Sequence, residues 1–220
     1  MEALILYLIL FFPGISIPGI YIPDFTAHVI NTAESIPFSV ASSLNRTISY
    51  TLPALALLWY IILGKKSLSA IKPEKPCRQD VFSLAIGLPG LIVIALVISL
   101  IISYLSGNYG IAMPPGMEAP VNVVGWCVMV ILCLGTGYLE ETYFRFYLLT
   151  RLENYNLPSK VILSTMLFAF CHVHDGAFSV LNALLAGLLL SLLFIRYRSL
   201  HGIALAHGFY NIFVFTMGAF

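Results

Sequence analysis

Residues 81–105 read VFSLAIGLPGLIVIALVISLIISYL, a stretch without a single charged side chain. About 20 apolar residues in a helix cross the roughly 30 Å hydrocarbon core of a bilayer. This stretch is long enough to do so, and it is too long and too apolar on every face for a strand of a membrane β-barrel. It therefore predicts a membrane-spanning helix.

Comparable apolar stretches occur on both sides of this one. Six further helices are predicted, at residues 3–22, 47–63, 121–149, 159–173, 177–195 and 200–219. The first stretch lacks a basic start and a small-residue cleavage site, so we expect a retained helix rather than a signal peptide. The sequence thus predicts an all-α polytopic membrane protein with about seven transmembrane helices.

The amino-acid composition indicates that the lipid bilayer is the main solvent and partner of this chain. Hydrophobic residues make up 60% of it and charged residues only 10%, whereas soluble domains carry about 25% charged residues. The net charge of +1, without a basic stripe, argues against nucleic acid as a partner. The four cysteines lack the paired spacing of a disulfide framework or a cysteine zinc site.

Lysine and arginine prefer the cytoplasmic side of a membrane, and their positions predict the orientation. The segment 65–80 is rich in them, whereas the segment 106–120 holds none. An orientation with the N-terminus cytoplasmic and the C-terminus external places all basic residues except Arg46 inside. We expect a prokaryotic cell (inner) membrane, with N-terminal helices and a basic loop in residues 1–80 and a membrane-embedded core in residues 81–220.

Ionisable groups interrupt three of the predicted helices. Each such group costs about 2.5–3.5 kcal/mol on insertion scales, so a cluster of them suggests function. The groups occur as three short patterns: Glu140, Glu141 and Arg145; Phe168 and His172; His207 and Asn211. Residues four apart share a helix face, and Glu140 points about 100° away from Glu141. One carboxylate can therefore face a site while its neighbour pairs with Arg145.

The patterns EExxxR, FxxxH and HxxxN, in this order on hydrophobic helices, resemble the CAAX-protease and bacteriocin-processing family of Abi-type glutamate intramembrane endopeptidases. The resemblance covers about residues 121–215, so the catalytic core is expected in the last four helices. It implies hydrolysis of a membrane-associated peptide or protein without a required cofactor. It also implies that Glu140 and His172 activate water and that His207 and Asn211 stabilise the oxyanion. Glu141 with Arg145 is then a supporting ion pair, next to Phe168.

Two alternatives stay open. A zinc-dependent protease could use Glu140, His172 and His207 as ligands, although the HExxH spacing is absent. A non-catalytic immunity or scaffold protein could use the same polar groups to join helices. His174 and Asp175 are interpreted as a solvated turn and Cys171 as a packing residue. The substrate and the oligomeric state cannot be chosen from the sequence.

Overall fold

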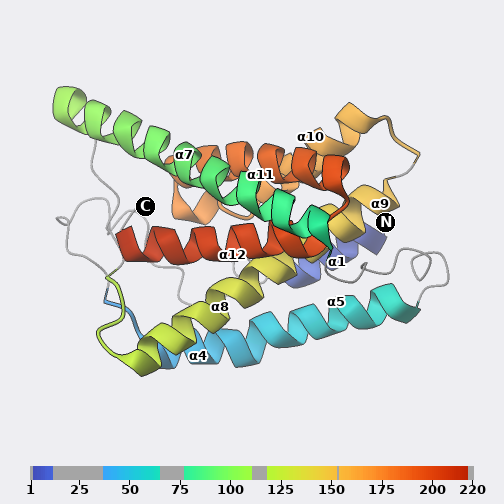
Figure 1. Ribbon diagram of the computed structural model, residues 1–220, viewed down its shortest axis with the longest axis horizontal. Coiled ribbons are helices and arrows are strands. Elements are labelled where there is room, and N and C mark those ends of the chain that lie inside the picture. Colours follow the sequence, from blue (N-terminus) through green and yellow to red (C-terminus); the bar gives the residue numbers. More distant parts are fainter. Residues whose placement is uncertain (1, 12–36, 65–76, 111–117, 153, 218–220) are drawn as a thin grey trace.

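A computed structural model describes residues 2–11, 37–64, 77–110, 118–152 and 154–217, without the side chain of His174. These residues form a helical bundle with no strand in the described ranges (Figure 1). Five helical segments in them are long and apolar enough to cross a membrane: Val40–Gly64, Arg78–Tyr109, Val123–Arg151, Ala177–Tyr197 and Leu200–Met217. Two shorter apolar helices, Glu2–Phe11 and Leu157–Phe170, accompany them. The prediction of an all-α polytopic membrane protein is confirmed.

The helix boundaries differ from the predicted ones in several places. Helix α1 (Glu2–Phe11) covers the start of the predicted first helix, and residues 12–22 of that prediction lie outside the described residues. The second segment begins seven residues earlier than predicted, because Ser39 caps α4 by accepting from the Ser42 N–H. It runs through α4 (Val40–Arg46), the π-helix η1 (Thr47–Thr51) and α5 (Leu52–Gly64). Because α4 contains several polar residues, its start does not belong to an apolar run and was not predicted from hydropathy.

Helix caps set the beginnings of the helices that carry the candidate site. Asn122 begins α8 (Val123–Glu141), since its side chain accepts from the Gly125 N–H at 2.8 Å. Asn156 does the same for α10 (Leu157–Phe170), accepting from the Ser159 N–H at 2.9 Å. Such side chains satisfy N–H groups that a helix start leaves without a carbonyl partner.

The centre of the bundle is α12 (Leu200–Met217), which packs most extensively against α7 (Arg78–Tyr109) and α8. In Figure 1, α12 lies between α7 on one side and α8 on the other, and α8 crosses to meet α4. Helix α11 (Ala177–Tyr197) packs against α10 and α7. The helices α8, α10 and α12, on which the three sequence motifs lie, are therefore packed into one bundle with α7 and α11.

Aromatic side chains fill the core beside α8. After Glu141 the helix continues as a π-helix, η2 (Thr142–Leu148), and a short turn of α-helix, α9 (Leu149–Arg151). Phe144, Phe146 and Tyr147 are buried in this segment. Phe11 of α1 packs on Phe144 with ring centroids 4.8 Å apart. These aromatic side chains therefore pack in the core of the bundle.

Candidate active site

The two candidate carboxylates lie where α8 changes into a π-helix. Glu140 and Glu141 are the last residues of α8, and Arg145 follows inside η2. Single π-turns inside longer helices occur frequently at functional sites, because they shift the side chains that follow. Ser164 of α10 donates to the Phe144 carbonyl at 2.8 Å and so ties the π-helix to its neighbour.

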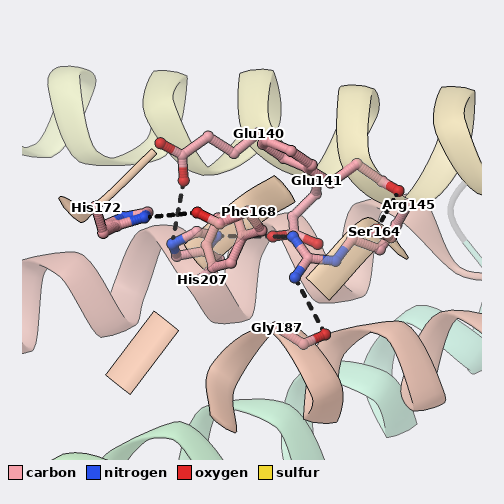
Figure 2. Close-up of polar contacts among 9 residues, drawn as sticks. Glu140, Glu141, Arg145, Ser164, Phe168, His172, Gly187 and His207 are labelled. Atoms are coloured by element: carbon pink, nitrogen blue, oxygen red, sulfur yellow. Dashed lines mark hydrogen bonds and ion pairs between the residues drawn. The ribbon is translucent and has the colours of Figure 1, made fainter. Parts of the chain in front are cut away.

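Glu141 contacts two nitrogen-bearing side chains from different helices. Its Oε1 atom accepts from Nη1 of Arg145 at 2.8 Å and from Nδ1 of His207 at 2.8 Å. Figure 2 shows the resulting chain from Arg145 through Glu141 to His207. The predicted contact between Glu141 and Arg145 is present, and Glu141 has a second partner that the spacing did not reveal.

Arg145 is completely buried, and three further contacts hold its guanidinium. Nη2 donates to the Gly187 carbonyl of α11 at 3.2 Å, and the guanidinium carbon lies 4.4 Å from the centre of the Phe168 ring. A cation over an aromatic face gains about 0.5–2 kcal/mol, more when water is excluded. The Phe144 ring lies next, at 5.8 Å. Phe168 thus supports the ion pair directly.

Glu140 points to the other nitrogen of His207. Its Oε2 atom lies 3.6 Å from Nε2 of that ring, longer than a direct hydrogen bond but within ion-pair range (Figure 2). The Glu140 side chain is 15% exposed, whereas that of Glu141 is fully buried. Glu140 is therefore the more exposed carboxylate of this pair.

His172 lies just beyond the last residue of α10, in the turn before the 3₁₀-helix η3 (Val173–Asp175). The prediction placed it within a helix reaching residue 173, but α10 ends at Phe170. Nδ1 of His172 lies 2.9 Å from the Phe168 carbonyl. A carbonyl can only accept, so Nδ1 donates in this contact, and Nε2 is the nitrogen that has a lone pair when the ring is neutral.

The Phe168 ring lies between the two histidines. Its centroid is 4.9 Å from that of His172 and 5.8 Å from that of His207. Within the described residues no hydrogen bond or ion pair joins Glu140 to His172, so the expected partnership of these two groups stays a prediction. The contact that the structure gives Glu140 is with His207.

Asn211 lies one turn after His207 on α12 and is partly buried. Across the ranges given above, its side chain makes no hydrogen bond with another described residue. It shares a helix face with His207 by its spacing, so its proposed role depends on a substrate rather than on a contact seen here.

Zinc binding gains no geometric support from this arrangement. In the described part of the chain, no three histidine, cysteine, aspartate or glutamate side chains form a group that could hold a metal ion. Glu140, His172 and His207 all border the site, but they do not converge on one point as zinc ligands do. The side chain of His174 lies outside this comparison, since the structure does not describe it.

Two glycines that sequence analysis did not single out bring α8 and α12 into contact. A Cβ atom at Gly137 would lie 2.8 Å from the Ala204 carbonyl oxygen and 2.8 Å from the Gly208 nitrogen. A Cβ at Gly208 would lie 3.0 Å from Cα of Leu134. Only glycine permits this backbone approach. The signal was available, because small residues four apart, such as Ala204 and Gly208, mark close helix pairs in membranes.

Tyr7 of α1 is a second contact that the sequence did not predict. Its hydroxyl donates to the Leu167 carbonyl at 3.0 Å, and the Cys171 thiol lies 3.4 Å from that hydroxyl. Cys171 is partly buried here, in agreement with its interpretation as a packing residue. The N-terminal helix therefore holds the end of α10 that leads into His172.

Fold and site together define an α-helical polytopic membrane protein that keeps two carboxylates, an arginine and a histidine in contact inside its helical bundle. Residues 121–213 match the family model for type II CAAX prenyl endopeptidase Rce1-like proteins. This match confirms the resemblance given by the three motifs, and it covers nearly the same segment. No curated protein and no solved structure matches the chain. The family match supports an intramembrane endopeptidase in general.

Proposed function

We propose that this protein hydrolyses a peptide bond of a membrane-associated peptide or protein, with water activated by Glu140 and His172. The observation that carries the proposal is the contact of Glu140 with His207 beside the buried pair of Glu141 and Arg145. Glu140 is the partly exposed member of this group, as a general base that meets water must be.

In the proposed reaction, Glu140 takes a proton from water while the water oxygen bonds to the scissile carbonyl carbon. The lone pair on Nε2 of His172 accepts a hydrogen bond from the same water, because its Nδ1 proton is held by the Phe168 carbonyl. The carbon–nitrogen bond then breaks, and Glu140 passes the proton to the leaving amine. Atoms and charges balance without a covalent intermediate.

His207 is proposed to stabilise the oxyanion together with Asn211. Nδ1 of His207 donates to Glu141, and Nε2 faces Glu140. Carboxylates at both nitrogens favour the imidazolium, whose Nε2 proton can be donated to a developing negative charge. The two carboxylates then balance Arg145 and His207, which lowers the cost of burying all four groups.

The orientation predicted from the sequence remains part of the proposal. The helix ends that carry Arg78, Arg151, Lys160 and Arg196 lie at the same end of the bundle (Figure 1). Such a distribution favours this end as the cytoplasmic one. We propose a prokaryotic inner membrane with a cytoplasmic N-terminus, and a membrane-embedded core that starts near residue 81.

The test compares peptide termini in membranes from cells that express the wild-type protein or Glu140→Gln at equal levels. The proposal expects termini that occur only with the wild type. A second comparison adds a peptide with a prenylated C-terminal cysteine or its unprenylated counterpart. Cleavage of the prenylated peptide alone would indicate a substrate of the kind that the name of the matched family describes. Identical sets of termini from the two kinds of cells would contradict the proposal.

The two alternatives predict different results in the same cells. A zinc protease would lose cleavage with a chelator and regain it with added zinc, whereas direct attack by water activated at Glu140 is expected to be insensitive to both. A scaffold or immunity protein would keep its biological effect in Glu140→Gln and His172→Ala. Each outcome separates one alternative from the proposal.

A further inference from the structure

Asp80 is a partly buried polar junction outside the candidate site and outside the matched segment. It lies in the first turn of α7, and both of its carboxylate oxygens are used. Oδ2 accepts from the Cys77 N–H at 2.7 Å, which caps α7 itself. Oδ1 accepts from the Gly202 N–H at 3.1 Å and from the Ser199 hydroxyl. One side chain therefore caps two helices.

The second helix of this pair is α12, which carries His207 and Asn211. Ser199 directly precedes α12, and its Oγ atom accepts from the Gly202 N–H at 3.1 Å. That is the usual N-cap contact. Asp80 adds a negative charge at the positive end of the helix dipole, from a neighbouring helix rather than from α12 itself.

The backbones of α7 and α12 also lie very close together at this point. A Cβ atom at Gly202 would collide with the Asp80 carbonyl oxygen and would lie 2.8 Å from Cβ of Ser83. The starts of α7 and α12 lie at the same end of the bundle (Figure 1). This first turn of α12 also contacts α8, since the Tyr138 hydroxyl and Nδ1 of His201 are 3.2 Å apart.

Such a connection determines where His207 lies. From Gly202 to His207 the helix rises about 7.5 Å, so a tilt or rotation at the first turn moves the imidazole relative to Glu140 and Glu141. The Nδ1 atom of His207 makes a 2.8 Å contact with Glu141 that permits little such movement. Catalytic geometry is sensitive at this scale, because a displacement of about 1 Å can cost 10²-fold in rate.

We infer that Asp80 is a positioning residue for His207, acting through Ser199 and Gly202 at the start of α12. The inference rests on the proposed function, and it places a residue of α7 in the support of a site that the family match alone would confine to residues 121–213. Asp80 does not touch the proposed substrate. Its effect is on the position and orientation of the helix that carries the imidazole.

The experiment measures two properties of Asp80→Ala in detergent or liposomes: hydrogen exchange of the α12 amides, and kcat and KM for the peptide identified by the membrane comparison. The control is Asn122→Ala, which removes an N-cap from α8 at the end far from Glu140 along that helix. Asp80→Ala is expected to speed exchange in the first turn of α12. It is also expected to lower kcat by about tenfold or more while KM changes little. Asn122→Ala should do neither.

Asp80→Asn distinguishes the effect of Asp80 on α12 from its effect on α7. Asparagine keeps an oxygen that can accept from Gly202 and Ser199, but its NH₂ group cannot accept from the Cys77 N–H. Recovery of most of the kcat in Asp80→Asn supports positioning of α12. Failure of that recovery, or a loss of kcat in Asp80→Ala no greater than in Asn122→Ala, would overturn the inference.

The two measurements also separate this inference from the proposed function. Faster exchange in α12 with no cleavage by any form of the protein, wild type included, contradicts the proposed function and leaves the link between Asp80 and α12 supported. Unchanged exchange in Asp80→Ala contradicts the inference, whatever the cleavage rates are. Should Asp80→Ala not fold, Ser199→Ala removes only one of the contacts and takes its place in both measurements.

Discussion

Nδ1 of His207 and Nη1 of Arg145 both lie 2.8 Å from the same oxygen, Oε1 of Glu141. This shared oxygen links α12 to the π-helix that follows α8. Glu141 is thus more than the counter-charge of Arg145, because it also fixes the ring that faces Glu140. The adjacent carboxylates therefore have different surroundings, and this difference leads to the first prediction.

Glu141→Gln is expected to destabilise the protein strongly, whereas Glu140→Gln is not. Loss of the Glu141 charge leaves the fully buried Arg145 without its ion-pair partner, and breaking a buried pair costs about 3–5 kcal/mol. Glu140 is partly exposed and pairs only at 3.6 Å. Thermal unfolding of both variants in the same detergent checks this, and equal melting temperatures would contradict it.

Gly208→Ala is expected to lower both stability and activity. Its methyl group would lie 3.0 Å from Cα of Leu134, so α8 and α12 must separate. We expect a loss of about 1–3 kcal/mol, as for other overpacked sites, and a weaker contact between Glu141 and His207.

The control for this change is Gly107→Ala in α7, where an added Cβ would meet no atom within 4 Å. Alanine should be neutral there or stabilise the helix by about 0.5–1 kcal/mol. Both variants are compared with the wild type by thermal unfolding and by cleavage. Similar effects of the two substitutions would show that the close approach of α8 and α12 is not the cause.

Ser164→Ala tests the support of the π-helix. The Ser164 hydroxyl is buried and donates to the Phe144 carbonyl at 2.8 Å. Its removal leaves a buried carbonyl without this donor, at a cost of about 1–3 kcal/mol. Ser191 is the matched control, since its buried hydroxyl has no hydrogen-bond partner among the described residues. Denaturation should separate the two, and a Ser191→Ala variant as unstable as Ser164→Ala would refute the assignment.

Tyr7→Phe is expected to affect catalysis through the turn that contains His172. The change removes the hydroxyl that donates to the Leu167 carbonyl and keeps the ring that packs on Phe144. A lost hydrogen bond is worth about 1 kcal/mol, so kcat should fall several-fold with little change in KM. Tyr104→Phe, on an exposed side chain of α7, is the control. A wild-type kcat in Tyr7→Phe would show that α1 does not support this turn.

Much of the fold was predictable because hydrophobic length alone identifies membrane helices. The segment 81–105 lies within the observed helix Arg78–Tyr109. The start of α4 was missed, because it depends on the Ser39 cap and not on hydropathy. Helix α10 was predicted to extend through His172, but the chain turns after Phe170.

The candidate site was predictable only within single helices. Spacing four apart correctly predicted the contact between Glu141 and Arg145. Contacts between helices depend on how α8, α10 and α12 cross, which no single-helix periodicity specifies. The bond of Glu141 to His207 and the support of Arg145 by Gly187 are therefore structural findings. The division of the chain near residue 80 and the roles of the site residues stay predictions.

The central claim is that Glu140 activates water for peptide hydrolysis. Its most direct test is the cleavage rate of a peptide spanning the identified bond, by purified protein in liposomes, for the wild type and Glu140→Gln at equal amounts of folded protein. General-base catalysis contributes about 10²–10⁴-fold to the rate, and we expect the cleavage rate of the variant to fall by at least about 10²-fold. Cleavage by Glu140→Gln at the wild-type rate would contradict the account.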